Sequence, residues 1–255
     1  MGFGNRLYPW ARCHLHSRAH HLPMLAPHWW WPPRVRPLLA HPPAPRELPG
    51  HLYLEGIRSL PEYVSGARAA LIGATSRGNV LVFRGEGGRF ADLQGHEAVL
   101  KDALQRMSTA ALPQSDAYVG MHVRRGDFNA QARTSDAWFI AALRALRARI
   151  GREVPAIIVS DARRRDLQAV LREPCVRLLR THAPLGDLLV LAGARLLLAS
   201  GSSFSAWAAF LGGMPSATAP EHSLGWFGLR ARSFLGHFDP AQDNTQFLEA
   251  AAAVF

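Results

Sequence analysis

The stretch Tyr118-Val-Gly-Met-His-Val-Arg-Arg-Gly-Asp127 decides the fold of this chain. It begins as an apolar run, as a buried strand does, and it ends in two arginines, a glycine and an acid. Open α/β sheets build ligand sites where strands deliver polar residues at their carboxyl ends. Because side chains alternate along a strand, His122 and Arg124 share one face and Arg125 takes the other. The pattern predicts that one face meets a ligand while the other is tied into the scaffold.

Two further predicted strands also end in polar residues. The first ends in Val159-Ser-Asp161, whose carboxylate either accepts hydrogen bonds from a guanine or a ribose or caps the next helix. The second ends in Ser200-Gly-Ser-Ser-Phe-Ser205, where hydroxyls and a glycine at a helix amino terminus form either an anion site or a plain cap. Parallel strand ends line one rim of a sheet. These residues therefore favour a pocket for a nucleotide diphosphate.

In that pocket each residue type has an expected partner. Arg124 suits a phosphate, because its charge is permanent and its planar fork binds two oxygens at once. The turn at Ser202 and Ser203 offers backbone N–H groups to the same phosphates. Asp161 and His122 are expected to face the base or the ribose. The positive groups would then stabilise the departing diphosphate, as a metal does elsewhere.

The second half of the sequence alternates between strand and helix patterns. Helix 136–150 has Ser135 as its predicted N-cap and Gly151 as its stop. Five strands alternating with helices predict an α/β fold with a parallel, Rossmann-like sheet. The predicted strands cover residues 118–124, 155–160, 175–179, 196–199 and 216–219, and the other helices 163–172, 185–194 and 204–211.

The first half has weaker signals. Gly2–Leu7 is predicted as a glycine-rich turn that feeds a helix over residues 8–20. Residues 23–49 are rich in proline and form either an ordered acceptor-side loop or a surface with peripheral membrane contact, unless Trp29–Trp31 simply pack under the prolines. Short strands are predicted at 69–72 and 80–83 and a helix at 97–107. We place a domain boundary after residue 114, with a reduced acceptor-side domain at 1–114 and a nucleotide-binding domain at 115–255.

Composition restricts the class of protein. A hydrophobic content of 48% and a mean hydropathy of -0.03 describe a globular, soluble chain. The net charge of +10 suggests an anionic partner, although Lys101 is the only lysine among 29 basic residues, so genome composition explains the excess equally well. Two cysteines and no signal pattern predict a cytoplasmic protein. We expect no metal site, since no Asp-x-Asp pair or His/Cys cluster with metal spacing is present, and the Walker A pattern is missing.

The quoted motifs resemble those of a known family. Gly2-Phe-Gly-Asn-Arg-Leu7 is similar to the Gly-x-Gly-Asn-Gln-Leu opening of α-1,2-fucosyltransferases, the family 11 type of glycosyltransferase. His122–Asp127 looks like the His-x-Arg-Arg-x-Asp motif that they share with α-1,6- and protein O-fucosyltransferases. Ser160-Asp161 resembles their Ser-Asp-Asp element. Asp187–Leu211, with Ser202-Ser-Phe-Ser-Ala-Trp207 at its centre, looks like their Asp-Leu…Asn-Ser-Ser-Phe-Ser-Trp-Trp segment.

The resemblance implies a GT-B-like pair of Rossmann-type domains and an inverting, metal-independent transfer of L-fucose from GDP-fucose. The acceptor would be a glycan, free or lipid-linked, in bacterial polysaccharide biosynthesis. The resemblance also assigns roles to residues of this chain. Arg124 would hold the diphosphate with Arg125 beside it, His122 and Asp161 would face guanosine, Ser202, Ser203 and Phe204 would close the pocket, and Asn5 would lie near the reacting centre. Asp127 is either the general base or the partner of a neighbouring arginine.

The sequence departs from this family at several positions. The chain starts at the Gly-x-Gly-Asn turn, where the family has a preceding strand, and Arg6, Gly201 and Ala206 replace an amide, Asn and Trp. A transferase for a different nucleotide sugar therefore stays open, as does a non-catalytic relative that binds glycans or anions. A basic, nucleic-acid-binding protein is a third alternative. It would need clustered arginines interleaved with exposed aromatics, and in the sequence the arginines are dispersed.

Overall fold

The computed structural model describes residues 2–20, 83, 85–113, 117–126, 133–230, 233–242 and 245–255. The chain divides into two compact units, Met1–Gly87 and Gly88–Phe255. The predicted strand at 69–72, residues 80–82 of the predicted strand 80–83 and the Trp29–Trp31 segment lie outside the described residues, and Phe83 is not in a strand. The boundary after residue 114 stays a prediction, and the helix Glu97–Met107, which we expected in the first domain, belongs to the second unit.

In the first unit the described structure is mainly one helix, α1 (Phe3–His20). The prediction of a glycine-rich turn at Gly2–Leu7 is therefore wrong, because the helix already begins at Phe3. Gly4, Leu7, Tyr8 and Ala11 are buried at helical spacing, so packing along this face outweighs the low helix propensity of glycine.

The second unit is built on a six-stranded parallel sheet with the strand order β3-β2-β1-β4-β5-β6. This order reverses direction between β1 and β4, as in doubly wound Rossmann-type sheets. The predicted parallel α/β fold is confirmed for this unit. Its strands are β1 (Val119–Val123), β2 (Ala156–Ser160), β3 (Val176–Leu178), β4 (Leu196–Ala199), β5 (Ser216–Thr218) and β6 (Leu235–His237).

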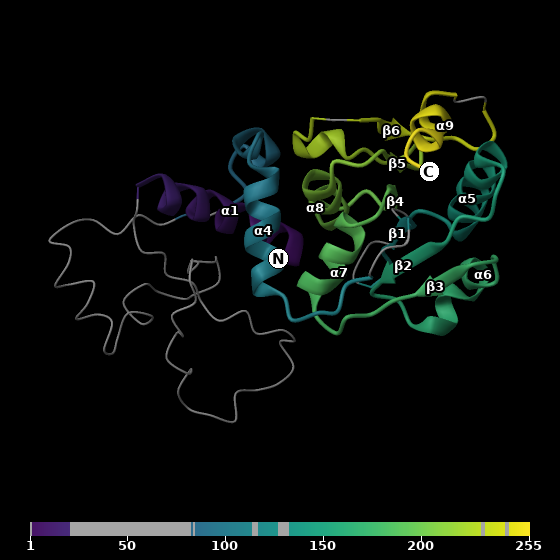
Figure 1. Cartoon of the computed structure of the whole chain (residues 1–255), viewed down its shortest axis with the longest axis horizontal. Helices are drawn as coiled ribbons and strands as arrows, with labels where there is room; N and C mark the ends of the chain where they lie inside the picture. Colours follow the sequence, from purple (N-terminus) through teal and green to yellow (C-terminus); the bar gives the residue numbers. More distant parts are fainter. Residues whose placement is uncertain are drawn as a thin grey trace, which may run out of the picture. The chain divides into compact units, whose positions relative to one another are not determined.

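Helices cover both faces of the sheet (Figure 1). One face of β1, through Val119, Met121 and Val123, packs in a core with residues of α5 and α9. The other face is close to α7, and Gly120 has no room for a side chain, since a Cβ there would lie 2.9 Å from Ala194. The helices of this unit are α4 (Glu97–Met107), α5 (Asp136–Ile150), α6 (Gln168–Leu171), α7 (Pro184–Ala192), α8 (Ser203–Gly212) and α9 (Thr245–Ala252), with 3-10 turns η1 (Arg89–Leu93), η3 (Arg164–Leu167) and η4 (Gly225–Phe227).

Helix α5 forms as its sequence predicts. The Ser135 hydroxyl accepts a hydrogen bond from the N–H of Trp138 at 3.1 Å, and Gly151 ends the helix in the left-handed conformation at a φ of 78°. The predicted helix 163–172 is instead the 3-10 turn η3 followed by the short α6. The sheet also has one strand more than predicted, β6, and α9 follows it.

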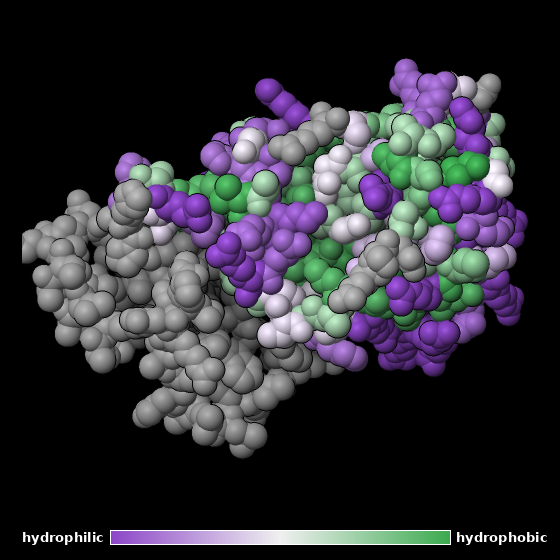
Figure 2. All heavy atoms as spheres, in the orientation of Figure 1, coloured by the Kyte–Doolittle hydropathy of each residue, from purple (hydrophilic) through white to green (hydrophobic). Residues whose placement is uncertain are grey.

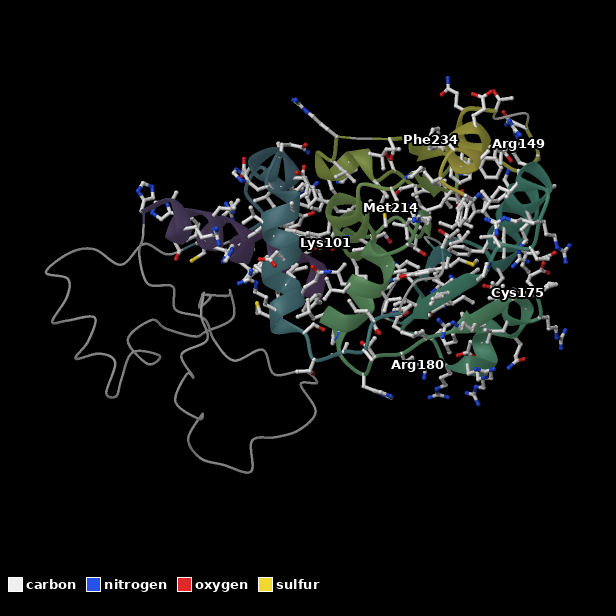
Figure 3. The ribbon with its side chains drawn as sticks, in the orientation of Figure 1. Lys101, Arg149, Cys175, Arg180, Met214 and Phe234 are labelled. Atoms are coloured by element: carbon white, nitrogen blue, oxygen red, sulfur yellow. The ribbon has the colours of Figure 1, made fainter. Side chains whose placement is uncertain are left out.

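Exposed arginines gather around β3, although the sequence suggested that the arginines are dispersed. In Figure 2 hydrophilic residues are dense over the part of the molecule where Figure 1 places α6 and β3. Arg180, labelled in Figure 3, lies at this edge and donates a hydrogen bond to the carbonyl of Ala162. The exposed arginines of this group are Arg163, Arg164, Arg165, Arg172, Arg177 and Arg180. No helix in the described part of the chain is long and apolar enough to cross a membrane.

Candidate functional site

The ends of β1, β2 and β4 come together at the carboxyl edge of the sheet, as predicted. Strand β1 pairs with β2 on one side and with β4 on the other, in parallel register. The three polar segments that follow these strands therefore lie side by side on one rim, at the point where the strand order reverses. Hydrogen bonds between the segments fix their arrangement.

Arg124 is the first residue after β1, and its guanidinium is held by a carboxylate. Nη1 of Arg124 lies 3.1 Å from Oδ2 of Asp161, and about a quarter of each side chain is exposed. Oδ1 of Asp161 accepts a hydrogen bond of 2.7 Å from the backbone N–H of Arg125. The carboxylate thus bonds both the arginine side chain and the backbone that carries it, which fixes the direction of the guanidinium.

Gly126 permits this arrangement. A Cβ at residue 126 would lie 2.4 Å from Oδ2 of Asp161, closer than any real contact, so a side chain there would displace the carboxylate. Ser160, just before Asp161, donates a hydrogen bond of 2.5 Å to the carbonyl of Val123 and accepts one of 3.0 Å from the N–H of Ala162. The ends of β1 and β2 are therefore joined by the Ser160 side chain as well as by the backbone hydrogen bonds between the two strands.

Arg125 points to the opposite face, as the alternation of strand side chains predicts. Its guanidinium pairs with Asp136 in the first turn of α5, and its Nη1 donates to the carbonyl of Arg124 at 3.0 Å. Arg125 is therefore a scaffold residue in this structure, and its predicted contact with the donor stays a prediction.

The turn after β4 leads into α8. The Ser202 hydroxyl accepts a hydrogen bond from the N–H of Ser205 at 3.3 Å, which makes it the N-cap of this helix. Ser200 joins the turn to β1: its hydroxyl donates to the carbonyl of His122 at 2.9 Å and accepts from the N–H of Arg124 at 3.1 Å. The amides in the first turn of a helix have no acceptor within the helix and carry its positive dipole end. The end of β1 at Arg124 is bonded through its backbone to the turn that leads into this helix end.

His122 lies beneath this turn and is buried, with 3% of its surface exposed. Its Nδ1 shares a 2.6 Å hydrogen bond with the Ser205 hydroxyl, and its ring lies 5.0 Å from that of Phe204. Burial, reinforced by the charge of Arg124 and opposed by Asp161, lowers the pKa of His122 to about 4. A neutral imidazole therefore supports the α8 turn, and the role toward guanosine predicted for His122 stays a prediction.

The other predicted site residues have different outcomes. Asp127 lies outside the described residues. Asn5 lies in the first turn of α1, half-buried, and its N–H bonds the carbonyl of Gly2 at 3.2 Å. No cluster of His, Cys, Asp and Glu that could hold a metal occurs among the described residues.

Sequence reasoning missed three supports of the site. Ser200 and Ser205 were seen only as members of a hydroxyl-rich turn, and Asp136 only as the start of a helix. A hydroxyl at the last buried position of a strand is a usable signal, because it can bond the neighbouring strand end. An acid in the first turn of a helix carries less information, since it is common there for the helix dipole alone.

No protein-family profile and no curated protein matches the sequence. Solved structures with a similar fold include E. coli heptosyltransferase WaaC with ADP, at 16% identity and a TM-score of 0.42 over 60% of this chain and 47% of that one. POFUT1, a protein O-fucosyltransferase, in complex with GDP is 14% identical, with a TM-score of 0.33 over 46% of this chain and 45% of that one. The UDP-GlcNAc 2-epimerase of Methanocaldococcus jannaschii is 11% identical, with a TM-score of 0.37 over 65% of this chain and 43% of that one. The chain thus spans less than half the length of each.

Proposed function

We propose that this chain is an inverting glycosyltransferase that moves L-fucose, or a similar deoxysugar, from its GDP donor to a hydroxyl of a glycan. The observation that carries the proposal is the position of Arg124. Its guanidinium is directed by Asp161, and its backbone N–H bonds the Ser200 hydroxyl in the turn before α8, at the reversal point of the sheet. A permanent cation and a helix amino terminus at one place suit a diphosphate.

In this reaction the acceptor oxygen forms a bond to the anomeric carbon as the bond from that carbon to the diphosphate oxygen breaks. The electron pair of the broken bond stays on the diphosphate. Arg124 and the α8 amides stabilise this charge as it develops, which favours the transition state over the bound donor. The acceptor proton passes to a base, for which Asp127 is the proposed carboxylate. The proposal requires no metal, because arginine supplies the positive charge.

The contacts of Asp161 favour an orienting role over direct recognition of guanosine. Both of its oxygens already bind Arg124 and the backbone of Arg125. Asp161 would then raise donor affinity by holding the arginine in place, since little side-chain freedom remains to be lost on binding. The preference for guanine over other bases would come from other residues.

The proposal is tested by calorimetric titration with GDP in EDTA, with GMP and UDP as comparisons. We expect micromolar binding of GDP that needs both phosphates, and at least a 30-fold loss in Arg124→Ala. Arg149→Ala is the matched control, because Arg149 is an exposed arginine near the other end of α5 from Asp136 (Figure 3). Equal binding by the Arg124→Ala and Arg149→Ala proteins would disprove the phosphate site.

Turnover is then measured with GDP-fucose and a panel of glycan acceptors. A folded protein that binds GDP but transfers nothing to any acceptor would support the non-catalytic relative, and tighter binding of UDP or another nucleotide would support a different donor. The exposed arginines around β3 favour the alternative that this chain is a polyanion-binding protein. That alternative predicts that Arg164→Ala combined with Arg165→Ala weakens binding to single-stranded DNA in a salt-dependent way while GDP has no effect.

A further inference from the structure

A hollow opens at the carboxyl ends of β4, β5 and β6, beside the phosphate-binding turn. Its volume is about 420 Å³, within the range of small-molecule sites. The proposed chemistry of Arg124 and Ser202 does not use this hollow. The residues that matter in its wall are Gly201, Glu221, His222, Trp226, Phe227 and His237.

His222 and Gly201 join the hollow to the turn. A Cβ at residue 201 would lie 2.7 Å from Cβ and 2.9 Å from Nδ1 of His222, so only glycine lets the imidazole pack here. The side chain of His222 is 9% exposed, and its buried Nε2 has no hydrogen-bond partner in the described residues. The nearest carboxylate oxygen, Oε1 of Glu221, is 3.9 Å away. A buried nitrogen without a partner is costly, so the position of this imidazole is held by its packing against Gly201 and not by hydrogen bonds of Nε2.

Trp226 gives the hollow an apolar surface. This residue is 77% exposed, an unusual state for so large a hydrophobic group. Its backbone is held in place, because Nη1 of Arg89 donates to the carbonyl of Trp226 at 3.0 Å and the guanidinium lies 5.5 Å from the ring centre of Phe227. The indole is thus presented to solvent by a fixed segment, η4.

A buried side chain outside the hollow holds two of its wall residues. The buried hydroxyl of Thr218 donates a hydrogen bond of 2.8 Å to the carbonyl of His222 and lies 3.3 Å from Nδ1 of His237. Because that hydroxyl has a single proton, Nδ1 of His237 is the donor in the second contact. Thr218, at the end of β5, therefore holds the backbone of His222 and the ring of His237 in place through one hydroxyl.

The order of the strands determines which part of a sugar nucleotide could reach this hollow. The diphosphate lies in the middle of such a molecule, and the proposed function places it at β1 and β4. The nucleoside and the sugar are attached to opposite ends of the diphosphate, and we place them along the rim in opposite directions. Neighbouring strands are about 4.8 Å apart, so β5 and β6 lie about one and two strand spacings beyond β4.

We propose that this hollow binds the hexose ring of the donor, while the nucleoside extends toward β2; the inference rests on the proposed function. The flat indole of Trp226 packs against the face of the ring that carries C–H bonds. Glu221, exposed beside it, accepts hydrogen bonds from ring hydroxyls, and His222, packed on Gly201, forms the wall between the ring and the turn before α8. Apolar walls with a few placed polar groups are typical of small-molecule sites.

The test compares GDP with GDP-fucose by calorimetry in the wild type and in Trp226→Ala, Trp226→Phe and Glu221→Gln. Both substituted residues are exposed, so the fold should survive. We expect the affinity of Trp226→Ala and Glu221→Gln for GDP to stay within twofold of the wild-type value. Their affinity for GDP-fucose should be at least tenfold lower than that of the wild type. Trp226→Phe should retain most of the affinity. Unchanged GDP-fucose binding, or an equal loss for both ligands, would overturn the proposal.

A second arm uses no nucleotide. Saturation-transfer difference NMR with methyl α-L-fucoside, methyl α-D-mannoside and methyl α-D-glucoside should show transfer to at least one ring, and Trp226→Ala should abolish it. If the wild type fails to bind GDP but shows this signal, the proposed function fails and the sugar site stands. If it binds GDP and shows neither a sugar signal nor a GDP-fucose difference between the proteins, the sugar site is wrong and the phosphate site stands.

Discussion

Asp161 binds Arg124 through its side chain and the following residue through its backbone: Oδ2 of Asp161 lies 3.1 Å from the Arg124 guanidinium, and Oδ1 accepts a hydrogen bond of 2.7 Å from the N–H of Arg125. Side chain and backbone are therefore fixed by one carboxylate at the exposed end of β1. A charge that is already oriented loses little entropy when an anion arrives. In the proposed function this relationship makes the carboxylate part of the phosphate site although its own charge is negative.

Asp161→Ala should therefore weaken nucleotide binding even though it removes a negative charge next to the phosphates. We expect about a tenfold loss, equivalent to about 1.4 kcal/mol, because Arg124 is freed to adopt other rotamers. The loss should be the same for GDP, ADP and UDP in parallel calorimetric titrations. A loss confined to GDP would instead give Asp161 the guanosine contact that the sequence suggested.

Gly126→Ala should produce a similar loss by a steric route. The added methyl group would lie 2.4 Å from Oδ2 of Asp161 and push the carboxylate away from Arg124. We expect about a tenfold weaker affinity for GDP and a loss of folding stability of about 1–2 kcal/mol from the crowding. The double variant with Asp161→Ala should bind GDP no worse than either single variant, since both act on one contact. Additive losses would show that Gly126 acts elsewhere.

The sequence predicted those parts of the fold that carry local signals. Helix α5 was predicted to the residue because Ser135 and Gly151 mark its ends through backbone chemistry. Strand β6 was missed because Leu235–His237 has a glycine at its centre, a residue that strands disfavour. The start of α1 was placed too late because local glycine propensity was weighed without the packing of Leu7 and Tyr8.

The site shows the same division. Arg124 and the Ser202 turn could be predicted because polar residues at strand ends meet on one rim of a parallel sheet. The hollow at Glu221–Trp226 could not, because it is formed by irregular segments whose position depends on the fold around them. Gly201 could be seen in the sequence, but the reason why a glycine is needed at this position could not. The imidazole that occupies the missing side chain's place comes from His222, on a different strand end.

Arg147 should matter for stability rather than for binding. Its buried guanidinium donates to the carbonyl of Val154 at 2.8 Å and to that of Pro174 at 2.6 Å, and it pairs with Glu153 at 2.9 Å. Arg147→Met leaves these acceptors without a donor, and we expect urea unfolding to show a loss of about 2–4 kcal/mol. Arg149→Ala, two residues further on an exposed face, should change the free energy of unfolding by less than about 0.5 kcal/mol. Similar values for the two variants would disprove the role of Arg147.

His122 should make folding stability depend on pH in a defined direction. Burial lowers its pKa from 6.5 to about 4, so between these values the unfolded chain binds a proton that the folded chain does not. Stability from this residue is therefore complete above pH 6.5 and is lost as the pH falls toward 4, by at most about 1.4 kcal/mol per pH unit. His122→Gln keeps a polar group near Ser205 but does not titrate, so its unfolding free energy should fall less steeply over this range. Urea titrations at pH 7.0, 6.0 and 5.0 measure the difference in slope, and parallel slopes in the two proteins would show that His122 is not held neutral by its surroundings.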